Sequence, residues 1–107
     1  MAYIEVDDSD FNEKLNEEFA KGQIVILKFY TEFCDACMAL DMELEDVDEE
    51  NENVSVIEVD CAECEYTAEK YGVLQVPTMV IMKDKDTTLF HKEGIVLSQD
   101  IEEIINS

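Results

Sequence analysis

Apolar residues along this chain follow two different patterns, and each pattern predicts one kind of element. Short runs of apolar and β-branched residues predict strands. These runs are Tyr3–Val6, Gln23–Tyr30, Asn53–Asp60, Thr78–Met82 and Thr87–His91. Between them, Phe11, Leu15 and Phe19 recur every fourth position and predict a helix over 11–21. Apolar residues set among polar ones predict further helices at 38–50, 66–71 and from Ser98 onward. This order predicts the α/β class, with a central mixed sheet and about four helices covering both its faces.

Punctuating residues predict where these elements begin and end. We expect a side chain among 7–10 to cap the first helix and Gly22 to end it. The Val76–Pro77 dipeptide ends the third helix, because the residue before a proline avoids the helical conformation. Lys83–Asp86 has the length of a hairpin loop, and Ser98 is the expected cap of the last helix.

Length and composition favour one small domain, residues 1–107. Its 47% of hydrophobic residues suffices for a core without a disulfide scaffold. No N-terminal run has the pattern of a secretion signal, and no apolar run nears the roughly 20 residues that span a membrane. We therefore expect a cytoplasmic protein, and in that compartment paired cysteines more often serve redox chemistry or metal binding than structural disulfides.

The chain is strongly acidic, with 7 basic and 28 acidic residues and a formal net charge of −21. Such a charge argues against binding to nucleic acid or to an anionic membrane surface. Two interpretations stay open: the charge selects partners with basic patches, or it only keeps a small protein in solution.

Two cysteines separated by two residues, Cys34 and Cys37, follow the apolar run 23–30 where a helical pattern opens. The unsatisfied N–H groups and positive dipole end of a helix favour an anion, which moves Cys34 toward the reactive thiolate. The pair therefore predicts a dithiol–disulfide oxidoreductase, with Cys34 as the attacking sulfur and Cys37 as the resolving sulfur. A cysteine hydrolase is disfavoured, because the only histidine, His91, lies on a late strand far along the chain.

Several motifs follow one another in a set order along the sequence. They are the apolar strand leading into Phe33-Cys34-Asp35-Ala36-Cys37, the pair Val59-Asp60, the run Lys70-Tyr71-Gly72-Val73 before Val76-Pro77-Thr78, and Gly94 before the last helix. Pro77 is the only proline and lies 40 positions after Cys37. With these motifs in this order, the chain resembles the thioredoxin family over nearly its whole length.

The resemblance implies a thioredoxin fold in which the Val76–Pro77 bond is cis and faces the cysteine pair. It also implies that the backbone of Val76 pairs with an extended substrate segment. The remaining docking residues that the resemblance implies are Phe33, Asp35, Ala36, Gly94 and Ile95. Its further implications are disulfide-containing protein substrates, an electron donor of the thioredoxin-reductase type, a monomer, and no bound cofactor or metal.

The sequence departs from the family pattern at three places. Phe33 replaces the usual tryptophan, Asp35-Ala36 replaces Gly-Pro, and Lys28 stands where the family has a buried carboxylate. If Lys28 is buried it can take the Cys37 proton as a neutral amine, and if its head group reaches solvent it has no such role. Asp35 and Glu32 raise the cost of a thiolate, so we predict a reduction potential toward the reducing end of the family.

Cys61 and Cys64 repeat the same spacing at the end of the third strand. Three interpretations compete: a second redox pair, two ligands of a four-cysteine metal site completed by Cys34 and Cys37, or small apolar core residues. The 23 residues between the two pairs exceed the usual 15–20 of such zinc sites. A thioredoxin-fold binding module without catalysis, or with a held metal, is the alternative to the oxidoreductase.

Overall fold

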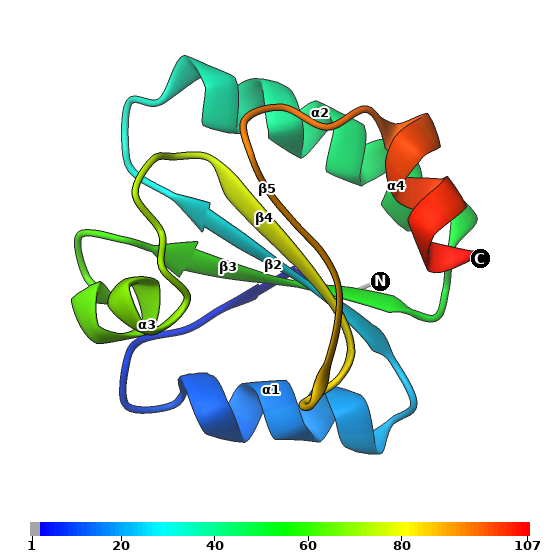
Figure 1. The fold of residues 1–107 in the computed structure, drawn as a ribbon, viewed down its shortest axis with the longest axis horizontal. Coiled ribbons are helices and arrows are strands. Elements are labelled where there is room, and N and C mark those ends of the chain that lie inside the picture. The colour runs from blue at the N-terminus through cyan, green and yellow to red at the C-terminus, as the bar shows by residue number, and fades with distance from the viewer. Residues whose placement is uncertain (1–2) are drawn as a thin grey trace.

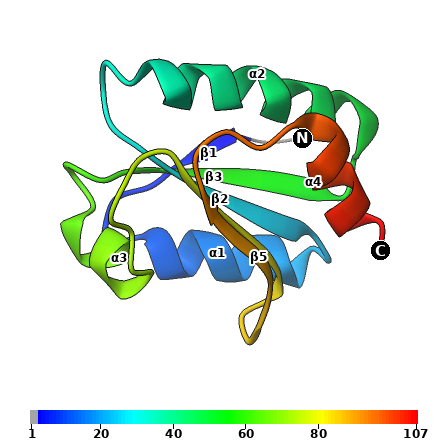
Figure 2. The same cartoon turned by 45° about the horizontal axis from the view of Figure 1, so that its top comes forward.

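The computed structural model describes residues 3–107 and shows an open sheet of five strands between two layers of helices (Figures 1 and 2). The strands are β1 (Tyr3–Glu5), β2 (Ile24–Tyr30), β3 (Val54–Asp60), β4 (Thr78–Asp84) and β5 (Thr87–Glu93). The helices are α1 (Phe11–Ala20), α2 (Asp35–Glu50), α3 (Glu65–Lys70) and α4 (Ser98–Ile105). The predicted order of elements is confirmed. In the described part of the chain, no helix has the length and apolar character that crossing a bilayer requires.

The sheet is mixed, as predicted, with strand order β1-β3-β2-β4-β5. β1, β3 and β2 run parallel, whereas β4 and β5 are antiparallel to their neighbours. The central strand β2 pairs on both sides, with β3 and with β4. Its interior residues are buried on both faces, which explains why its sequence is continuously apolar except at Lys28.

The core has one layer on each face of the sheet. α1 and α3 cover one face and α2 and α4 cover the other (Figure 2). Alternate residues of β2 divide between the layers: Leu27 and Phe29 pack on the α1 side and Ile26 packs on the α2 side. Lys28 continues the alternation and therefore points toward α2.

The N-cap of α1 is Asp10, within the predicted range, but it makes no side-chain capping bond, and the predicted cap of α4 was wrong. The side chain of Asp10, at the N-cap position of α1, accepts from the backbone N–H of Asp7 and from no helix N–H. Ser98 is the first residue of α4 and not its cap, and its backbone N–H donates to the Glu43 carboxylate of α2 at 2.9 Å. The hairpin loop is also shorter than predicted, because Asp84 and Thr87 already pair across β4 and β5.

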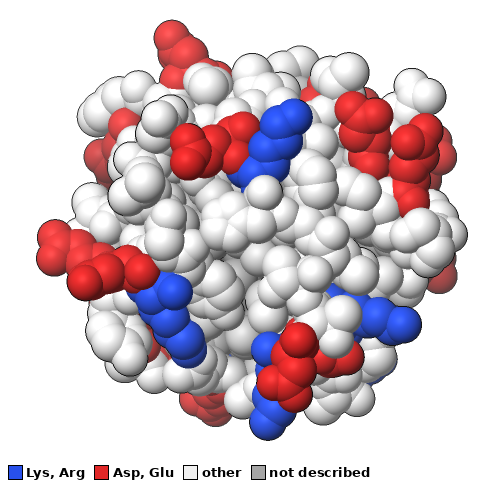
Figure 3. All heavy atoms as spheres, viewed as in Figure 1, with Lys and Arg blue, Asp and Glu red and all other residues white. Residues whose placement is uncertain are grey.

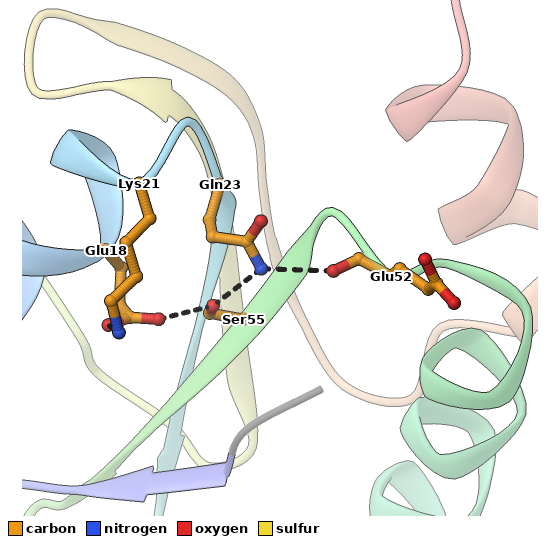
Figure 4. A network of polar contacts seen from close by, with 5 residues as sticks. All are labelled: Glu18, Lys21, Gln23, Glu52 and Ser55. Carbon is orange, nitrogen blue, oxygen red and sulfur yellow. Dashed lines mark hydrogen bonds and ion pairs between the residues drawn. The ribbon is translucent and has the colours of Figure 1, made fainter.

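A polar network fastens the end of the sheet where β2 and β3 begin (Figure 4). The buried Glu18 of α1 accepts hydrogen bonds from Ser55 at 2.7 Å and from Lys21 at 2.9 Å. Gln23 bridges from Ser55 to the backbone of Glu52. Burial raises the pKa of the Glu18 carboxyl, but the two hydrogen bonds outweigh burial and leave its pKa below the ordinary value. The opposite end of the sheet, where β2 and β3 finish, carries the cysteines.

Candidate active site

Cys34 and Cys37 are joined by a disulfide at the N-terminus of α2, with their Cα atoms 5.2 Å apart. Cys34 is the N-cap of the helix, and its sulfur accepts a hydrogen bond from the backbone N–H of Cys37 at 3.1 Å. Cys34 is partly exposed, whereas Cys37 is only 3% exposed. A partner molecule can therefore reach one sulfur of the pair and not the other.

The turn from β2 into α2 depends on an unusual backbone at Phe33. Its φ of 58° lies in the left-handed region, where bulky side chains are uncommon. The Phe33 side chain is 99% exposed, so no burial of its ring compensates this backbone. Strained, exposed residues of this kind occur mainly at functional sites. The sequence singled out Phe33 as a docking residue but gave no sign of its backbone conformation.

The loop before β4 brings the proline to the same end of the sheet. The Val76–Pro77 bond is cis, as predicted. Thr78 pairs with Phe29 near the end of β2, so the neighbouring Pro77 lies where β2 leads to the cysteines. The carbonyl of Pro77 accepts from the backbone N–H of Gly94 at 2.8 Å. Figures 1 and 2 show this loop and the loop before α2 at one end of the molecule.

Most of the predicted docking residues leave side chains or backbone open to a partner. Asp35 and Ile95 are exposed, the latter to 47%, and Ala36, Val76 and Gly94 are half-buried. Beside Val76 the surface is hollowed into a mainly apolar depression of about 300 Å³. The depression is lined by Thr31, Cys61, Ala68, Val73, Leu74, Gln75 and Val76.

Sequence reasoning missed most of this depression, because its lining comes from four separate stretches of the chain that only the fold brings together. Leu74 is a large apolar side chain that is 86% exposed and therefore contributes little to the packing of the core. Its position three residues before the only proline was the signal that could have identified it.

Lys28 is buried on the α2 face of the sheet, with its side chain 3% exposed. Its Nζ donates to Oδ1 of Asp41 on α2 and lies 3.9 Å from Oε1 of Glu58 on β3. The Nζ is also 5.0 Å from the centroid of the Tyr30 ring. The interpretation in which the head group reaches solvent is therefore wrong. A proton-handling role for Lys28 stays a prediction. The carboxylates of Asp41 and Glu58 beside its amine favour the charged ammonium, which cannot accept a proton.

Cys61 and Cys64 are free thiols. Cys64 is fully buried, and its Sγ donates to the carbonyl of Val6 at 3.4 Å. Burial and then the Asp8 carboxylate raise the pKa of Cys64 to about 11. Burial and Asp60 raise the pKa of the half-buried Cys61 as well. Both thiols are thus held in the less reactive protonated form.

The four-cysteine metal arrangement has no counterpart in residues 3–107. Within that range no three His, Cys, Asp or Glu side chains converge on a point where a metal ion could lie. Cys34 and Cys37 bond to each other, and Cys64 points away toward β1 and the loop that follows it.

The geometry described above defines a class of protein. A partly exposed cysteine, joined to a buried one at a helix N-terminus in a region with exposed apolar side chains, is the arrangement of a thiol–disulfide exchange site. A sequence profile of the Thioredoxin family matches residues 2–107. The chain belongs to the thioredoxin family.

Known relatives and solved structures agree with this assignment. The chain is 26% identical to the thioredoxin of Bacillus subtilis over 107 residues, which cover 99% of this chain and 97% of that protein. It is 34% identical to a putative protein disulfide-isomerase of Schizosaccharomyces pombe over 74 residues, covering 67% of this chain and 15% of that protein. It is therefore a thiol–disulfide oxidoreductase.

Solved structures confirm the fold. Chloroplastic thioredoxin z superimposes with a TM-score of 0.83 at 24% identity, covering 99% of this chain and 93% of that one. Thioredoxin f from spinach chloroplast gives 0.80 at 25% identity, covering 97% and 91%. The thioredoxin fold, with its mixed sheet, four helices and cis-proline, is as predicted from the sequence.

Proposed function

We propose that this chain is a protein disulfide reductase in which Cys34 attacks and Cys37 resolves. The observation that carries the proposal is the unequal exposure of the two cysteines joined by one disulfide. The exposed sulfur meets the substrate, and the buried one meets only its neighbour.

The reaction has two exchange steps. The Cys34 thiolate attacks a sulfur of the substrate disulfide, forming a mixed disulfide and releasing the other substrate sulfur as a thiolate. The Cys37 sulfur, after losing its proton, attacks Cys34; the Cys34–substrate bond breaks, and the second substrate sulfur leaves and takes up a proton. The substrate gains two electrons, and the protein is left with the Cys34–Cys37 disulfide that the structure shows.

Substrate docking rests on residues of the three loops at this end of the sheet. We assign the backbone of Val76 to an extended substrate segment, since its loop is irregular and carries the exposed Leu74 and the apolar depression. Phe33, next to Cys34, and Ile95, in the loop after β5, supply exposed apolar surface. We assign Asp35, Ala36 and Gly94 to the same docking surface, and the buried Pro77 to fixing the backbone of the neighbouring Val76.

The proposed setting is the cytoplasm, with disulfide-containing proteins as substrates and a reductase of the thioredoxin-reductase type as electron donor. Two free cysteines fit a reducing compartment. On the face shown in Figure 3, acidic and basic side chains are scattered among uncharged ones and not gathered into one acidic patch. This distribution favours the solubilising interpretation of the net charge for that face.

Trapping tests the two-step mechanism. The reduced Cys37→Ser variant should accumulate a mixed disulfide through Cys34 when it is mixed with a disulfide-containing protein such as oxidised insulin. The matched Cys64→Ser variant should accumulate none, because Cys37 still resolves. Non-reducing electrophoresis and mass mapping of the linked peptides give the answer. If Cys37→Ser forms no covalent adduct, the two-step mechanism is wrong and a binding module becomes the better account.

A further inference from the structure

The Lys28–Asp41 ion pair lies directly beneath the helix that carries the cysteines. Burying an ammonium costs free energy unless a carboxylate pairs with it. The carboxylate that is hydrogen-bonded to Lys28 belongs to Asp41 of α2. Asp41 is 39% exposed and Glu58 is 19% exposed, so the Lys28 amine is the most buried member of the group. The pair thus joins α2 to the centre of the sheet at one defined position.

Asp41 is also the neighbour of Cys37 on the helix. It follows Cys37 by four residues, a spacing that places two side chains on one face with Cβ atoms roughly 5–6 Å apart. Helical side chains lean toward the N-terminus, so the Asp41 carboxylate covers the turn that contains Cys37. Within residues 3–107, the only side-chain hydrogen bond of Asp41 is the one from Lys28 to Oδ1. Its Oδ2 is left to accept a proton.

The resolving step needs such an acceptor. Cys37 must lose its proton to become nucleophilic, and at 3% exposure it is poorly placed to give that proton directly to bulk water. A shallow hollow lined by Tyr3, Asp41, Glu45 and Glu58 opens from the ion pair to the surface. Asp41 therefore follows the buried Cys37 by one helical turn and also lines a hollow that is open to solvent.

Titratable groups from several neighbouring elements surround Asp41. Lys28 faces it from β2, Glu58 from β3, Tyr3 from β1, and Glu45 from the next turn of α2. Burial, and then Asp41 and Glu5, raise the pKa of Glu58 despite the opposing effect of Lys28. Glu58, which lines the same hollow as Asp41, therefore holds its own proton more readily than an ordinary glutamate does.

We propose that Asp41 accepts the Cys37 proton in the resolving step and that Lys28 is the positioning residue that holds Asp41 in place. The proton passes from Sγ of Cys37 to Oδ2 of Asp41, the Cys37 thiolate attacks Cys34, and the substrate thiolate leaves. Asp41 then returns its proton to the leaving sulfur or, through the hollow, to solvent. This assignment rests on the proposed function, because it requires Cys37 to resolve a mixed disulfide.

Stopped-flow reaction with 5,5′-dithiobis(2-nitrobenzoate) separates the two steps. The reduced protein should release one equivalent of coloured thiolate in a phase that depends on reagent concentration, which is the attack by Cys34. A second equivalent should follow in a concentration-independent phase, which is resolution by Cys37. All proteins compared carry Cys61→Ala, so that this half-buried thiol releases no colour.

We expect Asp41→Asn to slow the second phase at about pH 6.5 by about tenfold or more, the range of general base catalysis, and to leave the first phase within about twofold. The deficit should shrink toward pH 9, where hydroxide takes the proton instead. Asp46→Asn, an exposed aspartate on the same helix, is the control and should behave like the reference. Equal second-phase rates in Asp41→Asn and Asp46→Asn overturn the proposal, and so does a deficit that is the same at every pH.

Asp41→Asn leaves the Lys28 ammonium buried with less compensation and can unfold the protein. The double variant Lys28→Met/Asp41→Asn removes both charges and keeps the test valid. It should show the same slow second phase at low pH and the same recovery at high pH; a normal second phase in the double variant overturns the proposal. If the reference protein itself releases only one equivalent, the proposed function has failed, and that outcome is distinct from failure of the Asp41 assignment.

Discussion

The two Cys-x-x-Cys segments of this chain occupy similar places in the fold. Each follows the end of one of two neighbouring parallel strands, β2 or β3, and in each the helix begins at the residue after a cysteine. In the first segment the helix begins directly after the first cysteine, Cys34, so Cys37 is already inside α2. In the second segment the helix begins directly after the second cysteine, Cys64, so both cysteines lie before α3. A one-turn shift of the helix relative to the motif separates the two pairs.

The helix caps differ accordingly. In α2 the Cys34 sulfur itself accepts a helix N–H, whereas in α3 the carboxylate of Asp8 accepts from the N–H groups of Tyr66 and Thr67 at 3.2 and 3.0 Å. The sixteen-residue α2 thus directs its N-terminus at a sulfur, and the six-residue α3 directs its own at a carboxylate. The same Cys-x-x-Cys spacing therefore gives two different sites. A thiol is activated where its own sulfur accepts the N–H groups at the start of the helix, as in α2, and not where a carboxylate accepts them, as in α3.

The largest expected difference between the pairs is in turnover. Cys34→Ser should abolish the reduction of insulin disulfides by dithiothreitol, because no attacking sulfur remains, whereas Cys64→Ala should retain it. Turbidity of the precipitating insulin chains measures both. Retained turnover in Cys34→Ser would show that another cysteine attacks.

Within the second pair, the two cysteines should differ in how much their replacement lowers the unfolding free energy. Cys64→Ala leaves a cavity in a fully buried position and removes the hydrogen bond to Val6, which should cost about 1–2 kcal/mol of unfolding free energy. Cys61→Ala, at a half-buried position, should stay within about 0.5 kcal/mol of the parent. Urea unfolding of the oxidised proteins measures both, and equal losses would contradict a packing role specific to Cys64.

A smaller effect is expected in the loss of folding stability at alkaline pH, to which the buried thiol Cys64 should contribute. Cys64 has its pKa raised from 9.0 to about 11 in the folded protein, so folding favours its protonated form. The stability gained in this way is complete below pH 9 and is lost as the pH rises toward 11. Urea midpoints of the oxidised protein should fall across this window, and Cys64→Ala should fall less. Parallel curves for the two proteins would remove Cys64 from the alkaline transition.

The smallest effect concerns Asp8, which is the largest charged contributor to the raised pKa of Cys64. Asp8→Asn should therefore move the pKa of Cys64 downward, toward its ordinary value, and should loosen the first turn of α3. The pH dependence of Cys64 alkylation in mild urea measures the first effect, and hydrogen exchange in α3 measures the second. An unchanged pKa would mean that Asp8 does not contribute to the raised pKa of Cys64.

Much of the fold followed from local patterns. The apolar runs and the glycine after α1 are features of neighbouring residues, and they predicted the elements and the mixed sheet. The cis-proline was implied by the family resemblance that the order of motifs carries. Gly22 adopts the positive φ of 81° that favours glycine at a helix end. Cys34 and Cys37 could be identified for the same reason, because their spacing and the helix start lie within one short segment.

The missed features depend on contacts between distant segments. Asp8 caps a helix 58 residues away, and Glu43 satisfies the N–H of Ser98 across 55 residues, so neither could be predicted from neighbours along the chain. The partner of Lys28 likewise depends on which residue of α2 lies over β2. The left-handed backbone of Phe33 had no signal either, since glycine or asparagine usually marks that conformation.

A redox titration of the purified, metal-free protein, with each cysteine assigned by alkylation and mass mapping, tests the central claim most directly. We predict that Cys34 and Cys37 interconvert reversibly between dithiol and disulfide at a potential near the reducing thioredoxins, about −270 mV. Cys61 and Cys64 should remain thiols throughout. A Cys34–Cys37 pair that stays reduced would contradict the reductase, and a Cys61–Cys64 disulfide that forms reversibly would contradict the difference between the two pairs.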